Sequence, residues 1–258
     1  MPRARAHFIA FKTILIKEVL RFLRIWVQTV LPPAVTMTLY FVIFGNLIGP
    51  RLGDLAGFTY MQYIAPGLIM MAIITNSYAN VVSSFYSSKF QRHIEELLVS
   101  PVPYYVIVLG FVAGGVARGL MVGLAVTAVS LFFTHLQIHS APVMAAVVLL
   151  TAMLFSLAGF VNGIYAKSFD DISIIPTFVL TPLTYLGGVF FSIQMLSPFW
   201  RQMSLLNPIL YMVNTFRYGV LGVSDINLAV AFGIITLLVA GLFMFSLWLL
   251  QRGTGVRQ

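Results

Sequence analysis

The chain has 258 residues, of which 60% are hydrophobic and 9% are charged, with a net charge of +8 and no cysteine. Its mean hydropathy of +0.97 is more than a globular core of this length can bury, so the composition excludes an ordinary soluble domain and predicts an integral membrane protein. The lack of cysteine excludes disulfides, thiolate metal sites and thiol catalysis. Because the basic residues are not gathered on a soluble domain, we expect no nucleic acid as partner.

Residues 1–25 predict a cytoplasmic N-terminus and a basic amphipathic helix that lies in the membrane interface. In HFIAFKTILIKEVLRFLRIW the apolar residues step by three or four, and the basic residues lie mostly off this stripe. No small-residue cleavage site follows, so we do not expect a removed signal peptide. The helix either anchors the orientation of the chain or contacts a partner. Its predicted stripe is Phe8, Phe11, Leu15, Val19, Phe22 and Trp26.

Residues 26–250 predict a domain of six transmembrane helices, since six runs approach or exceed the roughly 20 apolar residues that a span needs. Pro32 and Pro33 are expected to kink the first span. The run Ile209–Gly222 is too short to cross, which predicts a re-entrant or interfacial helix. Residues 251–258 then form a cytoplasmic tail. The predicted spans are Trp26–Ile48, Met61–Phe85, Tyr104–Phe133, Val143–Tyr165, Ile172–Phe191 and Leu228–Leu250.

The placement of Lys and Arg predicts that both termini are cytoplasmic, because cytoplasmic flanks retain positive charge. With six spans, the outer side holds only Arg51, Arg201 and Arg217. Arg118 falls within the third span, where it is either buried or reaches the inner head groups. The inner basic residues are Arg3, Arg5, Lys12, Lys17, Arg21, Arg24, Lys89, Arg92, Lys167, Arg252 and Arg257.

The segment KFQRHIEELLVSPVP (Lys89–Pro103) joins the second and third spans on the predicted cytoplasmic side and concentrates charge in an apolar chain. Its apolar residues recur at helical spacing, and Arg92 and Glu96 form an i,i+4 pair on another face. Three uses are open: docking into a groove of a cytoplasmic protein, lying flat in the head groups, or simply connecting two spans. The apolar stripe is Phe90, Ile94, Leu97 and Leu98.

Several polar residues near or within the spans have two readings each. Asn76, Asn80, Ser83 and Ser84 share one stripe of the second span, where they either line a translocation path or bond to neighbouring helices. Asp170 or Asp171 can cap the fifth span, and a contact with a cytoplasmic partner is the alternative. Four third-span glycines allow close helix approach, and these are Gly114, Gly115, Gly119 and Gly123.

On the predicted outer side, Gly187 and Gly188 permit a break after the fifth span. Re-entrant helices then precede the last span, and their aromatic residues form either an exit gate or an aromatic belt. His135 and His139 have i,i+4 spacing but no nearby third ligand, so we expect no metal. The aromatic residues are Tyr185, Phe190, Phe191 and Trp200.

These features, with TPLTYLGGVFF followed by LSPFW, NP and FRYG, resemble the membrane subunits of ABC-2 type exporters. The resemblance covers nearly the whole chain, is most specific between Pro176 and Gly219, and within the family is greatest to the small YadH-type bacterial permeases. It implies that the first inner loop is a coupling helix that seats in an ATPase subunit, with Glu95 and Glu96 as contacts. It also implies a homodimer that works with two ATPases.

The chain has no G-x-x-x-x-G-K-[ST] motif, so ATP and Mg are expected on a separate ATPase chain, with no cofactor on this one. We therefore expect a permease, not an enzyme, that exports an amphipathic lipid, glycoconjugate or drug across a bacterial inner membrane by alternating access. Membrane lipid surrounds it. The expected ATPase-docking residues are Lys89, Phe90, Arg92, Ile94, Glu95, Glu96, Leu97, Leu98, Asp170 and Asp171, and the expected path residues are Asn76, Asn80, Ser83, Ser84 and Tyr185.

Two other classes remain as alternatives. An ion-coupled secondary transporter should have carboxylates buried in the membrane, whereas all seven acidic residues are expected in loops or at helix ends. A membrane-embedded enzyme needs an acid, base or metal cluster. Of the four histidines, only His93 lies near acidic residues on the same side, within the charged helix.

Overall fold

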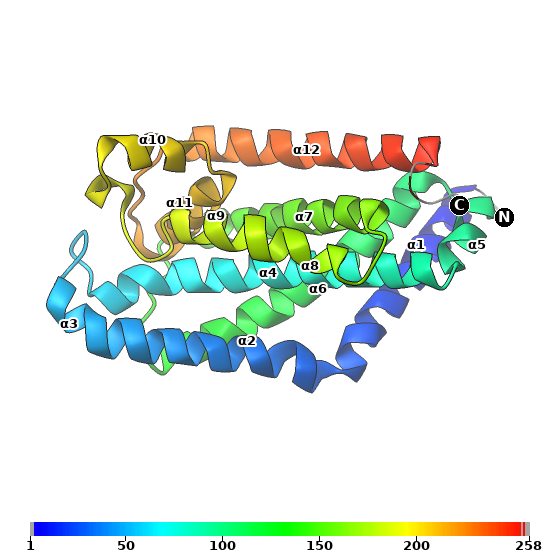
Figure 1. The fold of residues 1–258 in the computed structure, drawn as a ribbon. Coiled ribbons are helices and arrows are strands. Elements are labelled where there is room, and N and C mark those ends of the chain that lie inside the picture. The colour runs from blue at the N-terminus through cyan, green and yellow to red at the C-terminus, as the bar shows by residue number, and fades with distance from the viewer. Residues whose placement is uncertain (1–2, 254, 256–258) are drawn as a thin grey trace.

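The computed structural model describes residues 3–253 and 255, and its regular structure is helical apart from one β-bridge between Leu55 and Phe58. The long helices run along the length of an elongated bundle (Figure 1). Five helical stretches of the described chain are long and apolar enough to cross a membrane. The predicted all-helical class is confirmed. The five stretches are Trp26–Leu52, α4 (Tyr60–Phe90), α6 (Tyr104–Leu131), α7 (Ala141–Tyr165) and α12 (Leu228–Arg252).

Shorter helices lie before and between these stretches. The helix α1 (Arg3–Arg24) precedes Trp26–Leu52, which consists of α2 (Trp26–Tyr40), the π-helical η1 (Phe41–Ile48) and α3 (Gly49–Leu52). The remaining elements are α5 (His93–Val99), α8 (Asp171–Ile175), η2 (Pro176–Leu180), α9 (Thr181–Leu186), η3 (Ile193–Met195), α10 (Pro198–Leu205) and α11 (Pro208–Leu221).

The centre of the bundle is α4. In its most apolar 18-residue segment 78% is buried, whereas in the corresponding segment of α12 only 11% is buried. The helix begins with a capping box, in which Thr59 and Gln62 satisfy each other's backbone N–H groups. Its main neighbours are α6 and α7, and the hydrophobic core forms where the three helices meet. The apolar surface of α12 instead faces outward, as expected for a helix in lipid.

Close packing of α6 depends on the predicted line of glycines. A Cβ atom at Gly114 would lie 2.5 Å from Cβ of Glu18, and one at Gly123 would lie 2.7 Å from a side-chain carbon of Ile73. At Gly119 the added atom would overlap the hydroxyl oxygen of Ser77. The close approach predicted from these glycines is thus confirmed, with α1 on one side of α6 and α4 on the other.

The predicted fifth span is shorter than expected. The helical run Asp171–Leu186 is about 24 Å long at 1.5 Å per residue, less than the roughly 30 Å of hydrocarbon. It ends where Gly187 and Gly188 were expected to permit a break, because Gly188 adopts φ +71°, a left-handed conformation that favours glycine. The short helix predicted for Ile209–Gly222 is present as α11.

The first span continues through both of its prolines, and the interruption lies earlier, between α1 and α2 at Ile25. There the hydroxyl of the buried Thr29 donates to the backbone oxygen of Phe22 at 3.3 Å and to that of Ile25 at 3.1 Å. These bonds give partners to two carbonyl groups where α1 ends. The change of direction is visible in Figure 1.

The protein buries one face of α1 and leaves part of the predicted stripe exposed. Ile14, Glu18 and Phe22 are buried, whereas Phe8 and Trp26 are 63% and 60% exposed. A stripe read from apolar periodicity assumes that only one face of the helix meets apolar surroundings. Here the protein covers one face, and the exposed apolar residues of the other are suited to lipid. Glu18 is buried because it has hydrogen-bond partners on α1 and α4.

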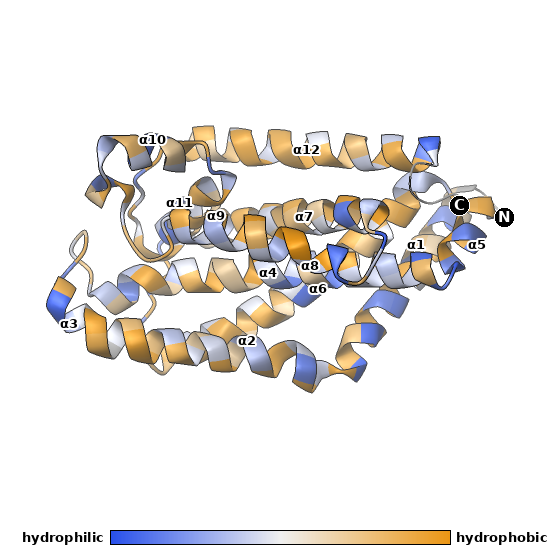
Figure 2. Ribbon diagram, viewed as in Figure 1, coloured by the Kyte–Doolittle hydropathy of each residue, from blue (hydrophilic) through white to orange (hydrophobic). Residues whose placement is uncertain are grey.

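The bundle has two distinct ends. The start of α1, the end of α12 and α5 lie together at one, and α3 and α10 lie at the other (Figure 1). We refer to these as the α5 end and the α10 end. Hydrophilic residues gather on α5 and on much of α1, while the long helices between the ends are mainly hydrophobic (Figure 2).

Candidate functional site

The charged helix predicted in the first loop is α5, at the α5 end of the bundle. Arg92 turns the chain between α4 and α5 with a left-handed φ of +61°. Ser100 is extended before Pro101, and the helix ends there as predicted. The structure therefore confirms a short helix with the predicted end, but Phe90 belongs to α4 and Arg92 to the turn, so the predicted i,i+4 pair of Arg92 and Glu96 does not lie on one helix.

The apolar stripe of α5 packs mainly against its own chain, which corrects the prediction of a free docking stripe. Ile94 is fully buried in a core cluster with residues of α4, α6 and α7, and Leu97 and Leu98 pack partly buried against the same cluster. Only Phe90, at the end of α4, remains 66% exposed. A seven-residue helix cannot hold its place in water without such contacts. The stripe serves to position α5.

The exposed face of α5 is instead charged. The side chains that face outward from the helix and the turn before it are Gln91, Arg92, His93, Glu95, Glu96 and Val99. Because Glu95 and Glu96 lie in the first turn, they also interact favourably with the positive end of the helix dipole. A partner that approached this face would meet two adjacent carboxylates flanked by a guanidinium and an imidazole.

Lys89 connects the end of α4 to the loop after α7. Its ammonium group donates to the backbone oxygens of Ile164 at 2.6 Å and Ala166 at 2.8 Å, and so satisfies carbonyl groups at the C-terminus of α7. Phe90 packs edge to face with Phe169 of the same loop at 5.4 Å. Lys89 thus has an internal role in addition to its predicted place in the docking set.

A cavity of about 280 Å³ lies between the two loops. Lys89 and Arg92 contribute its basic lining and Glu95 its acidic lining, and Lys167 comes from the second loop. The structure therefore brings four predicted docking residues, Lys89, Phe90, Arg92 and Glu95, around one hollow with Lys167, whereas the predicted Asp170 and Asp171 do not line it.

The two aspartates of the second loop have different roles. The Asp171 carboxylate accepts the backbone N–H groups of Lys167 at 2.8 Å and Ser168 at 3.0 Å. The hydrogen bond from Lys167, followed by the contact with Ser168, lowers the pKa of Asp171 below its ordinary value. Asp170 is exposed, and its side chain forms no cap bond. Asp171 therefore orders the loop that precedes α8, and Asp170 presents a free carboxylate.

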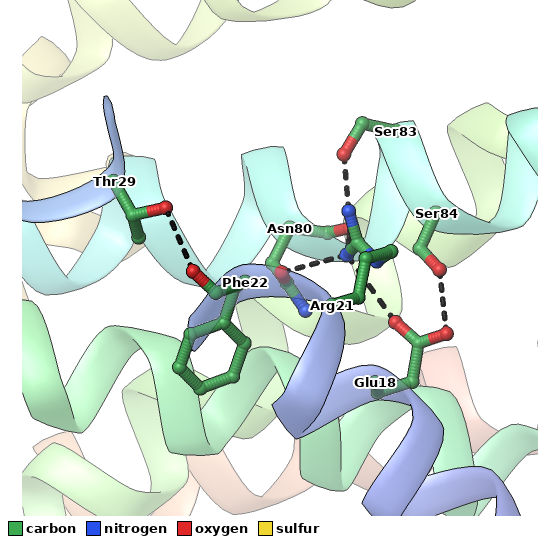
Figure 3. A network of polar contacts seen from close by, with 7 residues as sticks. All are labelled: Glu18, Arg21, Phe22, Thr29, Asn80, Ser83 and Ser84. Carbon is green, nitrogen blue, oxygen red and sulfur yellow. Dashed lines mark hydrogen bonds and ion pairs between the residues drawn. The ribbon is translucent and has the colours of Figure 1, made fainter. Parts of the chain in front are cut away.

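The polar stripe of α4 meets α1 in a buried network (Figure 3). Ser84 donates to one carboxylate oxygen of Glu18 at 2.6 Å, and Arg21 donates to the other at 3.2 Å. The same Arg21 nitrogen reaches the side-chain oxygen of Asn80 at 2.8 Å and its backbone oxygen at 3.1 Å. Ser83 bonds within its own helix, to the backbone oxygen of Asn80.

Arg118 of α6 lies on the same face of α4, one turn further along. Its side chain is partly buried and donates to the amide oxygen of Asn76 at 3.4 Å. Asn76 and Asn80 thus each accept a guanidinium from a neighbouring helix. Of the two readings of the polar stripe, this structure shows bonds to neighbouring helices. Tyr185, the other predicted path residue, is 42% exposed and bonds to the hydroxyl of Tyr40 at 3.1 Å.

Two charged residues were missed from the sequence. Glu18 was expected in a loop or at a helix end, yet it is fully buried in α1. The signal was its position four residues after Ile14 and four before Phe22, on the buried face. Arg217 is buried in α11, where a single charge in an otherwise apolar helix was the signal.

Residues 9–221, most of the chain, match the ABC-2 type transporter family. The chain belongs to the ABC-2 type transporter family. It is 60% identical over 251 residues to the inner membrane transport permease YadH of Escherichia coli K12, covering 97% of this chain and 98% of the relative. It is also 25% identical over 215 residues to nodulation protein J of Neorhizobium galegae, covering 83% and 82% of the two chains. The predicted resemblance is confirmed.

Membership in the ABC-2 family decides between the classes that the sequence left open. The chain is a membrane subunit of a transporter and not an enzyme, and the family implies an ABC ATPase as partner in general. The ion-coupled alternative had been disfavoured because all carboxylates were expected outside the spans. Glu18 is buried, but it lies in α1 and outside the spans, and the family match now decides against that alternative.

Proposed function

We propose that this ABC-2 family member is the inner-membrane permease subunit of an exporter, driven by a separate ATPase that docks at the α5 end. The observation that carries the proposal is the exposed charged face of α5, next to the loop 166–170, in a chain of this family. Two adjacent carboxylates and the free Asp170 give this surface a pattern that a basic groove on an ATPase would complement.

The proposed topology has six crossings and places both termini in the cytoplasm. Five long stretches and the shorter run Asp171–Leu186 make an even number, which agrees with the start of α1 and the end of α12 lying together (Figure 1). The run Asp171–Leu186 does not have to cross the whole hydrocarbon layer as a helix. Beyond Leu186 the backbone is no longer helical, and α11 supplies hydrogen-bond partners to it, as the bond from Arg217 to the backbone oxygen of Gly188 illustrates. In this topology α10 and α11 are re-entrant on the outer side.

The proposal divides the chain into three parts. Residues 1–25 form the cytoplasmic N-terminus and an interfacial helix, whose outward apolar side chains, such as Phe8 and Leu20, enter the lipid. Residues 26–250 form the transmembrane domain and residues 251–258 a cytoplasmic tail. Positive charge at the α5 end supports this orientation, since cytoplasmic flanks retain Lys and Arg.

The proposed substrate is amphipathic, in the class of lipids, glycoconjugates or drugs, and leaves the cell by alternating access in a homodimer. An apolar cavity of about 360 Å³ between α4, α6, α7 and α11 supports this class, because its lining suits a hydrocarbon chain. Its residues include Ile73, Leu124, Ile138, Met144 and Phe216. ATP and Mg would bind only the partner chain.

Co-purification tests the docking surface. We expect the tagged permease to retain an ATPase from its own cells and the variant Glu95→Lys/Glu96→Lys to lose it, because reversed charges repel the groove that the carboxylates fit. The matched control is Asp54→Lys, an exposed acid at the opposite end. An ATPase retained by the double variant would place docking elsewhere, and none with the unmodified chain would overturn the exporter proposal.

A further inference from the structure

A second polar site lies at the α10 end, away from the docking surface and from the network of Figure 3. Its central residue is Arg217, which is 1% exposed and lies over the ring of Tyr63 at 4.0 Å. One guanidinium nitrogen donates to the backbone oxygen of Gly188 at 2.6 Å, and another donates to that of Tyr63 at 3.3 Å. The third, Nη1, has no hydrogen-bond partner in the described part of the chain.

A buried guanidinium normally pairs with a carboxylate, because an uncompensated charge is costly away from water. Across residues 3–253 and 255, no carboxylate oxygen lies within 4 Å of Arg217. The site therefore holds a buried positive charge whose Nη1 atom, with two N–H groups, is unused. That is the condition under which a bound anion replaces an internal partner.

An acidic side chain lies in the same cavity without pairing with Arg217. The Asp225 carboxylate accepts the hydroxyl of Ser192 at 2.8 Å, the backbone N–H of Ile193 at 3.3 Å and the side-chain amide of Gln194 at 3.2 Å. These bonds hold the carboxylate in place against the segment that leads into η3. A carboxylate can accept about four hydrogen bonds, so one position is left.

Arg217 and Asp225 both line a cavity of about 320 Å³, together with Tyr63 and Asn214. This volume is at the small end of the usual range for ligand sites, about 300–1,000 Å³. A simple anion would be attracted by one side of the cavity and repelled by the other. A molecule with a negative and a positive end would satisfy both.

We propose that this cavity binds a small zwitterionic group, with a phosphate or carboxylate on Arg217 and a primary ammonium on Asp225. The site stands apart from the proposed transport cycle, because it rests only on the two charges and the cavity between them. Such a group occurs both in the head group of an ethanolamine phospholipid and in soluble amines that carry a phosphate or carboxylate.

Calorimetric titration of the full-length protein in lipid-free detergent tests the proposal with O-phosphoethanolamine as the probe. We expect it to bind at least about tenfold more tightly than inorganic phosphate or ethanolamine alone, which is the effect of one added charged hydrogen bond. Asp225→Asn should abolish this preference and still bind inorganic phosphate. Asp54→Asn, an exposed acid outside this cavity, should behave like the unmodified protein. Equal affinity for the probe and for phosphate, or an unchanged preference in Asp225→Asn, would overturn the proposal.

A labelling experiment guards against a variant that only disturbs the fold. The chain has no cysteine, so Met195→Cys reports on the cavity lining, and Met203→Cys on α10 serves as its control. We expect O-phosphoethanolamine to slow maleimide modification at position 195 but not at 203, and equal rates at 195 with and without the probe would refute binding there. Titration in nanodiscs of phosphatidylethanolamine and of phosphatidylglycerol then distinguishes the two sources of the ligand. If the probe binds more weakly in phosphatidylethanolamine, the site takes the lipid head group, and if it binds equally in both, the site takes a soluble ligand.

Discussion

The variant Glu18→Gln should destabilise the protein, because it removes a negative charge from a buried network while nearly conserving side-chain size. In the unmodified chain the carboxylate accepts Ser84 at 2.6 Å and Arg21 at 3.2 Å, and its exposed fraction is 0%. An amide oxygen can still accept one of these donors. The guanidinium of Arg21 would keep Asn80 as a partner but lose its counterion.

The expected loss follows from the two bonds that change. Hydrogen bonds to charged groups contribute about 1.5–3 kcal/mol and neutral ones about 1 kcal/mol, while polar bonds between membrane helices average about 0.6 kcal/mol. The Arg21 side chain is 32% exposed, so water screens part of its charge. We therefore expect Glu18→Gln to lower the free energy of unfolding by about 1–2 kcal/mol.

Unfolding by SDS in mixed micelles measures this free energy, with helicity as the signal. Glu96→Gln is the matched control, since that carboxylate is exposed on α5 and its replacement should shift the midpoint much less. A double-mutant cycle with Arg21→Gln should give a coupling of about 0.5–1 kcal/mol. A Glu18→Gln protein as stable as the unmodified one, or zero coupling, would show that the network adds nothing to stability.

Two further variants test other contacts. Gly119→Ala should destabilise by about 1–3 kcal/mol because its methyl group overlaps Ser77, whereas Gly241→Ala on α12 meets open space and should be neutral or stabilising in the same unfolding assay; equal effects would contradict the packing of α6. Asp171→Asn should speed amide exchange at Ser168, because the loop loses a charged acceptor. Since the pKa of Asp171 is lowered, its contribution to the order of this loop is full above the ordinary pKa near 3.9 and is lost as the pH falls through the lowered pKa. Protection of the Ser168 amide from exchange that persists below both pKa values would refute this role.

Helix positions were predictable because the length of an apolar run is a strong constraint in a bilayer. The ends of α4, α6, α7 and α12 lie within a few residues of the predicted spans. The break after Leu186 was also visible in the two glycines that follow it. Its stabilisation by Arg217 was not, because that contact joins positions 29 residues apart.

The faces of helices were less predictable than their ends. In α5 the apolar stripe around Ile94 was assigned to a partner, but the chain itself uses it. In α1 the stripe through Phe8 was expected in the membrane interface, and Phe8 is exposed, but Glu18, expected in a loop or at a helix end, is buried. The cause is that periodicity shows which side of a helix is apolar, and not whether lipid, protein or a partner covers it.

The bonds of Lys89 determine how mechanical load would spread from the α5 end. Because its ammonium group joins the last turn of α4 to carbonyls at the end of α7, a displacement of α5 strains both helices together. The edge-to-face contact between Phe90 and Phe169 forms a second connection between the same two regions. A displacement of α5 would therefore reach α4 and α7 together. A flexible loop between the two helices would instead have taken up part of the displacement.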